Sequence, residues 1–151
     1  PLNGTGGTSD DESHLPRTAF GHSHQDIEDD YRFYIINKKF EQMCNLPKEL
    51  LIGKTDYEVF LDEADKYRRD DTEASRYSED APLIINEIVT SPDRDVSTHL
   101  QTAKFSFSFK GKKLLVCVGN DVTLQHQMME QLKNALDKAE QADRLKAQFI
   151  S

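Results

Sequence analysis

The fold is decided by a stretch of alternating residues, THLQTAKFSFSF (98–109), which a short KGK turn (110–112) joins to LLVCV (114–118). Alternation with a period of two is typical of a half-buried β-strand, and a short glycine-containing turn that leads from it into an apolar run predicts a hairpin. One face of the first strand carries Phe105, Phe107 and Phe109. We therefore expect an antiparallel sheet with one apolar face and one polar face.

Two further strands are predicted upstream of this hairpin. The run LIINEIV (83–89) has the same period and precedes the turn-forming SPDRD (91–95), so three consecutive strands should form an antiparallel meander. The run YRFYII (31–36) is dense in aromatic and β-branched residues, which predicts another strand that ends at Asn37.

Short helices are expected between the first of these strands and the meander. Residues 38–43 form one helical stretch, and Pro47 stands near the first turn of a second, which Gly53 closes. Asp62 can cap a third helix that runs to about Tyr77. Its face is only weakly apolar, so we expect it on the surface. That face is formed by Ala64, Tyr67, Asp71, Ala74 and Ser75.

Residues 1–25 are predicted to be a flexible linker, because they are rich in Gly, Ser, Thr and Asp and lack apolar periodicity. Thr18 to Phe20 gives a weak strand signal that the following GHSH dilutes. His22 and His24 would point the same way on an extended segment, but two imidazoles without a third firm ligand rarely make a metal site. We favour a solvated loop and predict no metal.

The last segment, 124–150, contains neither Gly nor Pro and predicts a helix of about 40 Å. This is too long to pack wholly against a small domain. Steps of four and three residues trace a modest coiled-coil seam, which passes through the charged Lys146. The seam is formed by Met128, Leu132, Ala135, Ala139, Ala142 and Phe149.

Composition excludes several functional classes. The chain has 151 residues, 36% of them apolar, which suits one globular domain with tails. The formal charge is −8 with scattered Lys and Arg, so no basic stripe is available for nucleic acid. No apolar run is long enough to span a membrane, and we expect no membrane contact by this chain. Two cysteines do not make a secreted disulfide framework, which favours a cytoplasmic location.

The order of strand, short helices, surface helix, three-stranded meander and long exit helix resembles the PAS domains that precede kinase cores in two-component sensors. LLIGKTDYEVF (50–60) is similar to that family's ELIGKTDxxxF stretch, and GNDVT (119–123) to its Asp-aliphatic-Thr motif. The resemblance implies an α+β, PAS-like fold with the sensory domain at 26–123 and a signalling helix at 124–151. It also implies that Asp121 and Thr123 couple the sheet to the exit helix.

AEQADRLKAQFIS (139–151) is similar to the segment before the phosphoacceptor helix of sensor histidine kinases, many of them hybrid kinases. The Ser-His-Glu-x-Arg-Thr-Pro box is not reached, so we expect a piece of a longer kinase and no catalytic residue in this chain. The expected partners are a second copy, joined through the exit helix, and the kinase core of the parent chain, which itself could be membrane-anchored.

A small-molecule ligand is compatible with this family, and the apolar face of the sheet would supply either its pocket or the ordinary core. The candidate residues are Phe105, Phe107, Phe109, Val116, Val118 and Glu87. Haem is disfavoured, because the surface helix lacks the histidine that haem-binding relatives supply. Covalent flavin is disfavoured, because Cys44 is not in the NCRFLQ-type context of flavin photoreceptors. The cofactor is otherwise unassigned.

Three functions compete. The first is a sensor that relays a signal through Asp121 to Thr123 into a dimeric exit helix. The second is a ligand-free PAS domain that dimerises or spaces the kinase. The third is a small cone-shaped enzyme, which would need a buried acid with a shifted pKa, and Asp56 and Glu87 are its only candidates.

Overall fold

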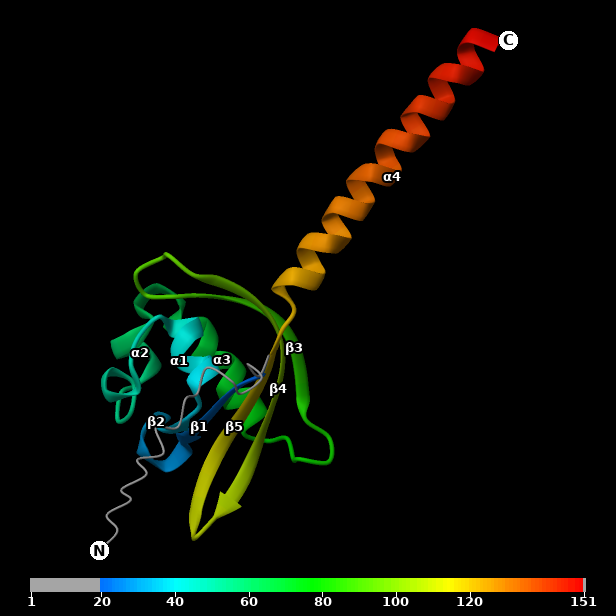
Figure 1. Cartoon of the computed structure of the whole chain (residues 1–151). Helices are drawn as coiled ribbons and strands as arrows, with labels where there is room; N and C mark the ends of the chain where they lie inside the picture. Colours follow the sequence, from blue (N-terminus) through cyan, green and yellow to red (C-terminus); the bar gives the residue numbers. More distant parts are fainter. Residues whose placement is uncertain (1–19, 151) are drawn as a thin grey trace, which may run out of the picture.

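The computed structural model describes residues 20–150, which form one antiparallel sheet, several short helices and a long helix that projects from the sheet (Figure 1). The five strands lie in the order β2-β1-β5-β4-β3. Their bounds are β1 Phe20–Asp26, β2 Arg32–Ile36, β3 Leu83–Thr90, β4 Ser97–Phe109 and β5 Lys112–Asp121. The predicted α+β class, an antiparallel sheet with short helices and a long last helix, is confirmed.

The predicted meander is present as β3, β4 and β5, each paired antiparallel with the next. Lys110 and Gly111 form the turn between β4 and β5, and both have positive φ, 49° and 76°. A two-residue turn of this kind matches the twist of the flanking strands, and glycine adopts it without steric cost. The KGK sequence therefore sets the register of the longest hairpin in the sheet.

Three α-helices lie together beside the sheet, α1 (Lys38–Cys44), α2 (Asp56–Val59) and α3 (Ala64–Ala74) (Figure 1). Asn37 caps α1, because its Oδ1 accepts from the backbone N–H of Phe40 at 3.0 Å. The same oxygen accepts from the N–H of His22 at 3.0 Å, which fixes α1 against β1. A polar cap thus also sets the position of a helix on the sheet.

The start of α3 differs from the prediction. Asp62 does not cap it, because residues 61–63 form a 3₁₀ turn and α3 begins at Ala64 without a side-chain cap. Asp62 and Glu63 instead pair with Arg94 in the loop between β3 and β4. The predicted face of α3 is correct in position, but it packs against the core instead of lying on the surface, and of its predicted members only Ser75 is not buried. Its buried residues are Ala64, Tyr67, Asp71 and Ala74.

The predicted linker is wrong at its end, where strand β1 lies. Residues 20–25, assigned to the linker, form most of a strand that pairs with β2 on one side and β5 on the other. Its backbone is satisfied on both edges, so the strand needs little apolar surface of its own. Ser23 and Gln25 face the interior, and His22 and His24 lie on the opposite face of this strand rather than in a solvated loop. The rest of the predicted linker, 1–19, lies outside the described residues.

The sheet also turns the opposite face inward from the one expected. Thr102 and Lys104 of β4 are buried beneath the helices, whereas Phe107 and Phe109 are each 42% exposed. Phe105 is half-buried and pairs with Val116, and Phe107 pairs with Leu114, on the outer face. The three phenylalanines therefore do not line the interior. The polar face can turn inward because acidic residues from a helix and a strand neutralise Lys104.

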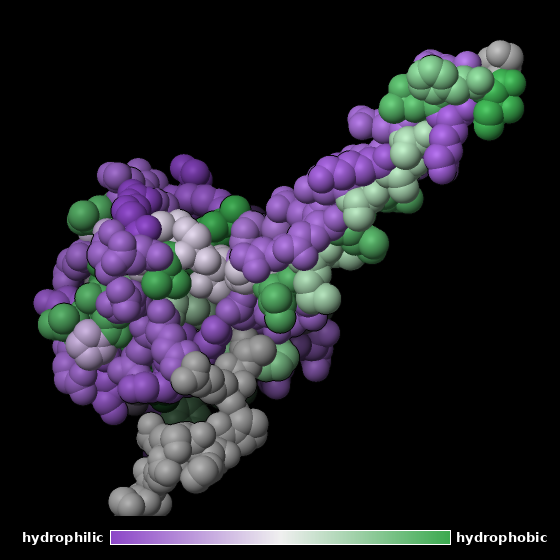
Figure 2. Space-filling model, turned by 45° about the horizontal axis from the view of Figure 1, so that its top comes forward, coloured by the Kyte–Doolittle hydropathy of each residue, from purple (hydrophilic) through white to green (hydrophobic). Residues whose placement is uncertain are grey.

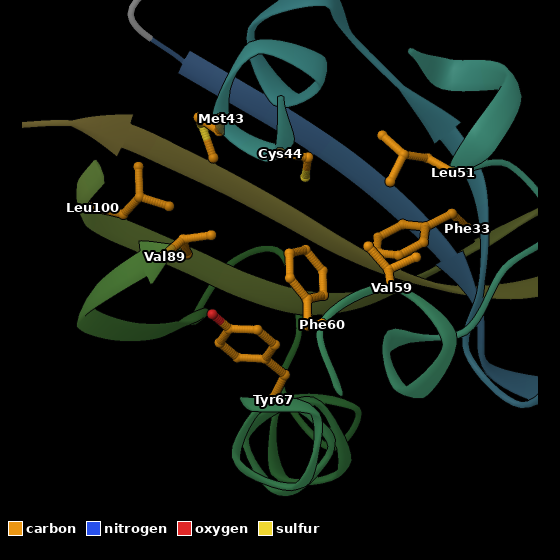
Figure 3. Close-up of a cluster of buried hydrophobic side chains, with 9 residues drawn as sticks. All are labelled: Phe33, Met43, Cys44, Leu51, Val59, Phe60, Tyr67, Val89 and Leu100. Carbon is orange, nitrogen blue, oxygen red and sulfur yellow. The ribbon is translucent and has the colours of Figure 1, made fainter. Parts of the chain in front are cut away.

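The apolar core lies between the helices and the sheet (Figure 3). Phe33 packs on Phe40 with ring centroids 5.4 Å apart, and Phe60 meets Tyr67 edge-on at 5.1 Å. Each such side chain contributes about 1.5–3 kcal/mol when it is fully buried. The cluster consists of Phe33, Met43, Cys44, Leu51, Val59, Phe60, Tyr67, Val89 and Leu100.

Helix α4 (Thr123–Ile150) leaves the end of β5 and extends away from the rest of the chain (Figure 1). Its 28 residues correspond to about 42 Å of helix. None of its residues is buried. The predicted long helix is confirmed, and its apolar side chains have no cover from the described residues of this chain.

Candidate functional site

A small cavity of about 60 Å³ lies between the helices and the inner face of the sheet. Its walls combine apolar side chains of the core, such as Phe60 and Leu100, with many polar and ionisable side chains. The polar and ionisable residues around it are Ser23, Gln25, Asp56, Tyr67, Asp71, Glu87, Thr102, Lys104 and Cys117. We call this cavity and its lining the interior pocket.

Lys104 is the centre of the charged part of the pocket. Its Nζ lies 3.0 Å from Oδ1 of Asp71 and 3.9 Å from Oε1 of Glu87. Burial alone would lower the pKa of Lys104, but attraction to the acidic groups around it outweighs burial and raises the pKa. The ammonium therefore stays charged, and it neutralises acids contributed by α3 and β3.

Asp56 begins α2 and points into the same pocket. Its Oδ2 accepts from Nε2 of Gln25 at 3.1 Å, and Gln25 also donates to the carbonyl of Tyr31 at 3.0 Å. Burial, reinforced by the nearby negative charge of Asp71, raises the pKa of Asp56 to about 7. This carboxyl is thus half-protonated near neutral pH, unlike an exposed aspartate.

Two residues that line the pocket each have a buried polar atom without a partner. Oε1 of Glu87 accepts from the hydroxyl of Thr102 at 3.0 Å, but Oε2 has no hydrogen bond within the described chain. The hydroxyl of Tyr67 is likewise unpartnered. Tyr67 extends from α3 with its hydroxyl directed toward the strands (Figure 3). A buried acceptor without a partner is uncommon in folded proteins, so the pocket has unused hydrogen-bonding capacity.

The joint between β5 and α4 is a second organised site, built around Asp121 and Thr123. Oδ1 of Asp121 accepts from the backbone N–H of Thr123 at 3.0 Å and from its hydroxyl at 2.6 Å. Thr123 Oγ1 in turn accepts from the backbone N–H of His99 in β4 at 3.0 Å. Nζ of Lys39 binds Oδ2 of Asp121 at 2.7 Å. We call these four residues the joint.

The charge of Asp121 is held by these contacts. Burial would raise the pKa of Asp121, but the hydrogen bonds from Lys39 and Thr123 outweigh it and lower the pKa. Asp121 is therefore ionised at neutral pH. The first turn of α4 makes a further contact with β4: the ring of His126 stacks on that of His99 with centroids 4.3 Å apart.

The predicted seam residues lie along the exposed shaft of α4. Figure 2 shows hydrophobic side chains recurring along the helix among hydrophilic ones. Leu132 is 64% exposed and Phe149 is 89% exposed. Met129 and Leu136, which the predicted seam does not include, are exposed next to it. The structure brings none of these side chains into a core, and the predicted pairing with a second copy stays a prediction.

Of the predicted site residues, Glu87 lines the interior pocket and Asp121 and Thr123 lie at the joint, and their roles in binding and coupling stay predictions. Val116 is buried, but with Val118 it belongs to the outer face of the sheet. The residues that were missed are Lys104, Asp71 and Gln25. Asp71 had a usable signal, because an acid four residues after Tyr67 on the inner face of α3 requires a buried partner.

The described residues give no support to a metal site, to a reactive Cys44 thiol or to a membrane-spanning helix. Within residues 20–150, no three His, Cys, Asp or Glu side chains are grouped to hold a metal ion. Cys44 is buried, and burial followed by the charge of Asp56 raises the pKa of its thiol to about 12. Among the described helices, none is both long and apolar enough to cross a membrane.

Solved structures with a similar architecture are PAS and light-oxygen-voltage (LOV) domains. The PAS domain of an HTR-like protein from Haloarcula marismortui aligns with a TM-score of 0.54 at 12% identity, over 73% of this chain and 92% of that one. An RNA-binding LOV receptor aligns with a TM-score of 0.56 at 12% identity, over 93% of this chain but 42% of that one. The LOV protein of Rhodobacter sphaeroides gives a TM-score of 0.53 at 12% identity, over 71% and 62% of the two chains.

No family model and no curated protein matches the sequence. At identities this low, the structural likeness establishes the fold and not the ligand or the activity. The strand order, the helices grouped on one face of the sheet and these structural neighbours agree. The chain has the PAS fold.

Proposed function

We propose that this chain is the sensory and relay domain of a sensor histidine kinase, and that it passes a signal from the sheet through the joint into a dimeric exit helix. The observation that carries the proposal is the joint itself. Asp121 and Thr123 connect α1, β4, β5 and the first residue of α4 through four hydrogen bonds.

The interior pocket is well placed to act on the joint. Leu100 and Gly119 line the pocket. Leu100 directly follows His99 in β4, and Gly119 lies two residues before Asp121 in β5. A change in what occupies the pocket would bear on the same two strands whose ends hold α4. Packed strands transmit such displacements because protein interiors are close-packed.

The exit helix is proposed to pair with that of a second copy. Its predicted seam is narrow and alanine-rich, so pairing would be modest in strength and easily changed between two arrangements. In the parent chain the paired helices would lead to the kinase core. The sensory unit begins no later than Phe20, where β1 starts, and the relay helix spans 123–150. A cytoplasmic location stays a prediction.

Native mass spectrometry of the purified chain tests this proposal. We expect a dimer that becomes monomeric when residues 124–151 are removed, with the mass of any retained small molecule reported in the same spectrum. A dimer that persists without α4 would contradict the relay through a paired exit helix. Far-ultraviolet circular dichroism of both forms controls for misfolding.

The ligand-free dimerisation domain is the second candidate. It predicts the same dimer but no response of the joint to any occupant of the pocket. The unpartnered Glu87 and Tyr67 atoms favour the sensor over this alternative. Haem and covalent flavin remain disfavoured, because a cavity of about 60 Å³ is far smaller than the roughly 300–1,000 Å³ of pockets for larger ligands.

The enzyme alternative receives one supporting observation, the raised pKa of Asp56. Its carboxyl is nevertheless bound to Gln25, and Glu87 is bound to Thr102 and lies beside Lys104. These contacts hold the acids in a binding pocket. We therefore rank the enzyme last.

A further inference from the structure

We propose that the interior pocket binds a small, singly charged organic cation of the primary-amine class, held by Glu87 and Tyr67. The inference rests on the sensory role proposed above and gives its ligand a chemical class. It starts from the unpartnered atoms of these two side chains and is then limited by the charge, size and walls of the pocket.

Glu87 supplies the anchoring acceptor. The residue is 9% exposed, and Oε2 has no hydrogen-bond partner within residues 20–150, although Oε1 is occupied by Thr102. The hydroxyl of Tyr67 is also buried and unpartnered, and an oxygen of this kind accepts as well as donates. An ammonium group has three donors and could satisfy both oxygens at once. A carboxylate ligand would instead meet the negative charge of Glu87.

The charge balance of the pocket favours a monocation. Three carboxyl groups, Asp56, Asp71 and Glu87, surround the single ammonium of Lys104. Burial followed by Asp71 raises the pKa of Asp56 to about 7, so a proton on Asp56 leaves two carboxylates against one ammonium. Glu87 keeps one oxygen, Oε2, without a hydrogen bond, so the excess negative charge is least compensated there. One ligand cation would neutralise it, and buried charges need such compensation.

An organic cation fits better than a metal ion. Lys104 already occupies the space between Asp71 and Glu87, and no group of three ligating side chains exists among the described residues. The lining also includes apolar and aromatic side chains. Phe60 and Tyr67 stand edge to face at 5.1 Å. Aromatic rings attract organic cations, and the apolar walls suit a short alkyl chain.

The volume sets the size of the ligand. A cavity needs about 10–15 Å³ by this measure for each water, so 60 Å³ holds about four to six waters. This corresponds to a ligand of about five non-hydrogen atoms, such as n-butylammonium. The best ligands of this size reach only micromolar affinity, so we expect a Kd between about 10 µM and 1 mM.

Isothermal titration calorimetry of the whole chain at about pH 7 tests the proposal with three probes of similar size, n-butylammonium chloride, n-butanol and sodium butyrate. We expect n-butylammonium to bind and the other two to bind at least tenfold more weakly. Glu87→Gln should weaken n-butylammonium binding at least tenfold, and Tyr67→Phe should weaken it severalfold. Glu79→Gln removes the same charge at an exposed position and should leave binding unchanged.

Each contrary result is decisive. Tighter binding of butanol or butyrate would overturn the cation while leaving a ligand-binding sensor. No binding of any probe at about 10 mM, ten times the weakest expected Kd, would mean that the pocket holds only water. Unchanged amine binding by both folded Glu87→Gln and Tyr67→Phe would place the ligand elsewhere. The dimer measurement proposed above is independent of all three outcomes, so the relay is judged separately.

Discussion

Nζ of Lys39 lies 2.7 Å from Oδ2 of Asp121, so a side chain of α1 holds the end of β5 where the chain enters α4. The other oxygen of the same carboxylate binds the backbone and the hydroxyl of Thr123. One carboxylate therefore joins a helix over the sheet, the strand beneath it and the exit helix. Any movement of α1 relative to the sheet must strain or break a contact of Asp121.

Asp121→Ala should uncouple the signal without unfolding the domain. Loss of these hydrogen bonds should cost about 1–3 kcal/mol of unfolding free energy, because Asp121 is only partly buried and water can replace it. In the parent protein, we expect the ratio of stimulated to unstimulated output to change. Lys39→Met should act in the same direction. Asp137→Ala, on the exposed shaft of α4, is the control, and regulation unchanged by Asp121→Ala would remove the joint from the relay.

Lys104→Met should be the most destabilising single change in the pocket. It leaves Asp71 and Glu87 buried without their cation, which typically costs about 3–5 kcal/mol. Urea denaturation followed by circular dichroism measures the loss. Adding Asp71→Asn to Lys104→Met should restore part of the stability, whereas Lys113→Met, exposed in β5, should change little. A loss below about 1 kcal/mol would show that the pair is open to water.

The sequence predicted the meander and the long helix because their signals are local. Period-two alternation marks β3 and β4, the KGK turn and the apolar run after it mark β5, and an uninterrupted run of helix-favouring residues marks α4. Alternation alone cannot say which face turns inward. Phe105, Phe107 and Phe109 look like the buried face until Lys104 is known to meet Asp71, a partner 33 residues away.

Strand β1 could not be predicted for a related reason. Its position in the middle of the sheet comes from backbone pairing with β2 and β5, which leaves no trace in composition. Its inward residues, Ser23 and Gln25, are polar because they border the interior pocket. The sequence therefore hides the pocket and strand β1 for the same reason: the sheet turns polar side chains toward the helices.

Stability should fall as pH rises from about 4 to about 7, and Asp56 should account for part of this fall. Burial and then Asp71 raise the pKa of folded Asp56 to about 7, above the value of about 3.9 in an unfolded chain. The folded state thus binds the proton more tightly, and its stability decreases between about pH 4 and pH 7 by up to 1.4 kcal/mol per unit. Above pH 7 the effect should level off.

The Asp56→Asn variant isolates this effect. Asn cannot titrate, so the free energy of unfolding of the variant should depend less on pH than that of the wild type between about pH 5 and pH 8. Chemical denaturation at these two values gives the comparison. Asp80→Asn, at an exposed position, should keep the wild-type dependence. Identical pH slopes for the wild type and Asp56→Asn would mean that Asp56 titrates normally.

Leu132→Asp should dissociate the proposed dimer. Leu132 is 64% exposed in the single chain and lies in the predicted seam, where a charge would face the same charge of a second copy. We expect the dimer dissociation constant from analytical ultracentrifugation to rise at least tenfold. Gln131→Asp adds the same charge about 100° around the helix and should leave the dimer intact. If Gln131→Asp dissociates the dimer and Leu132→Asp does not, the helices pair through a face other than the predicted seam.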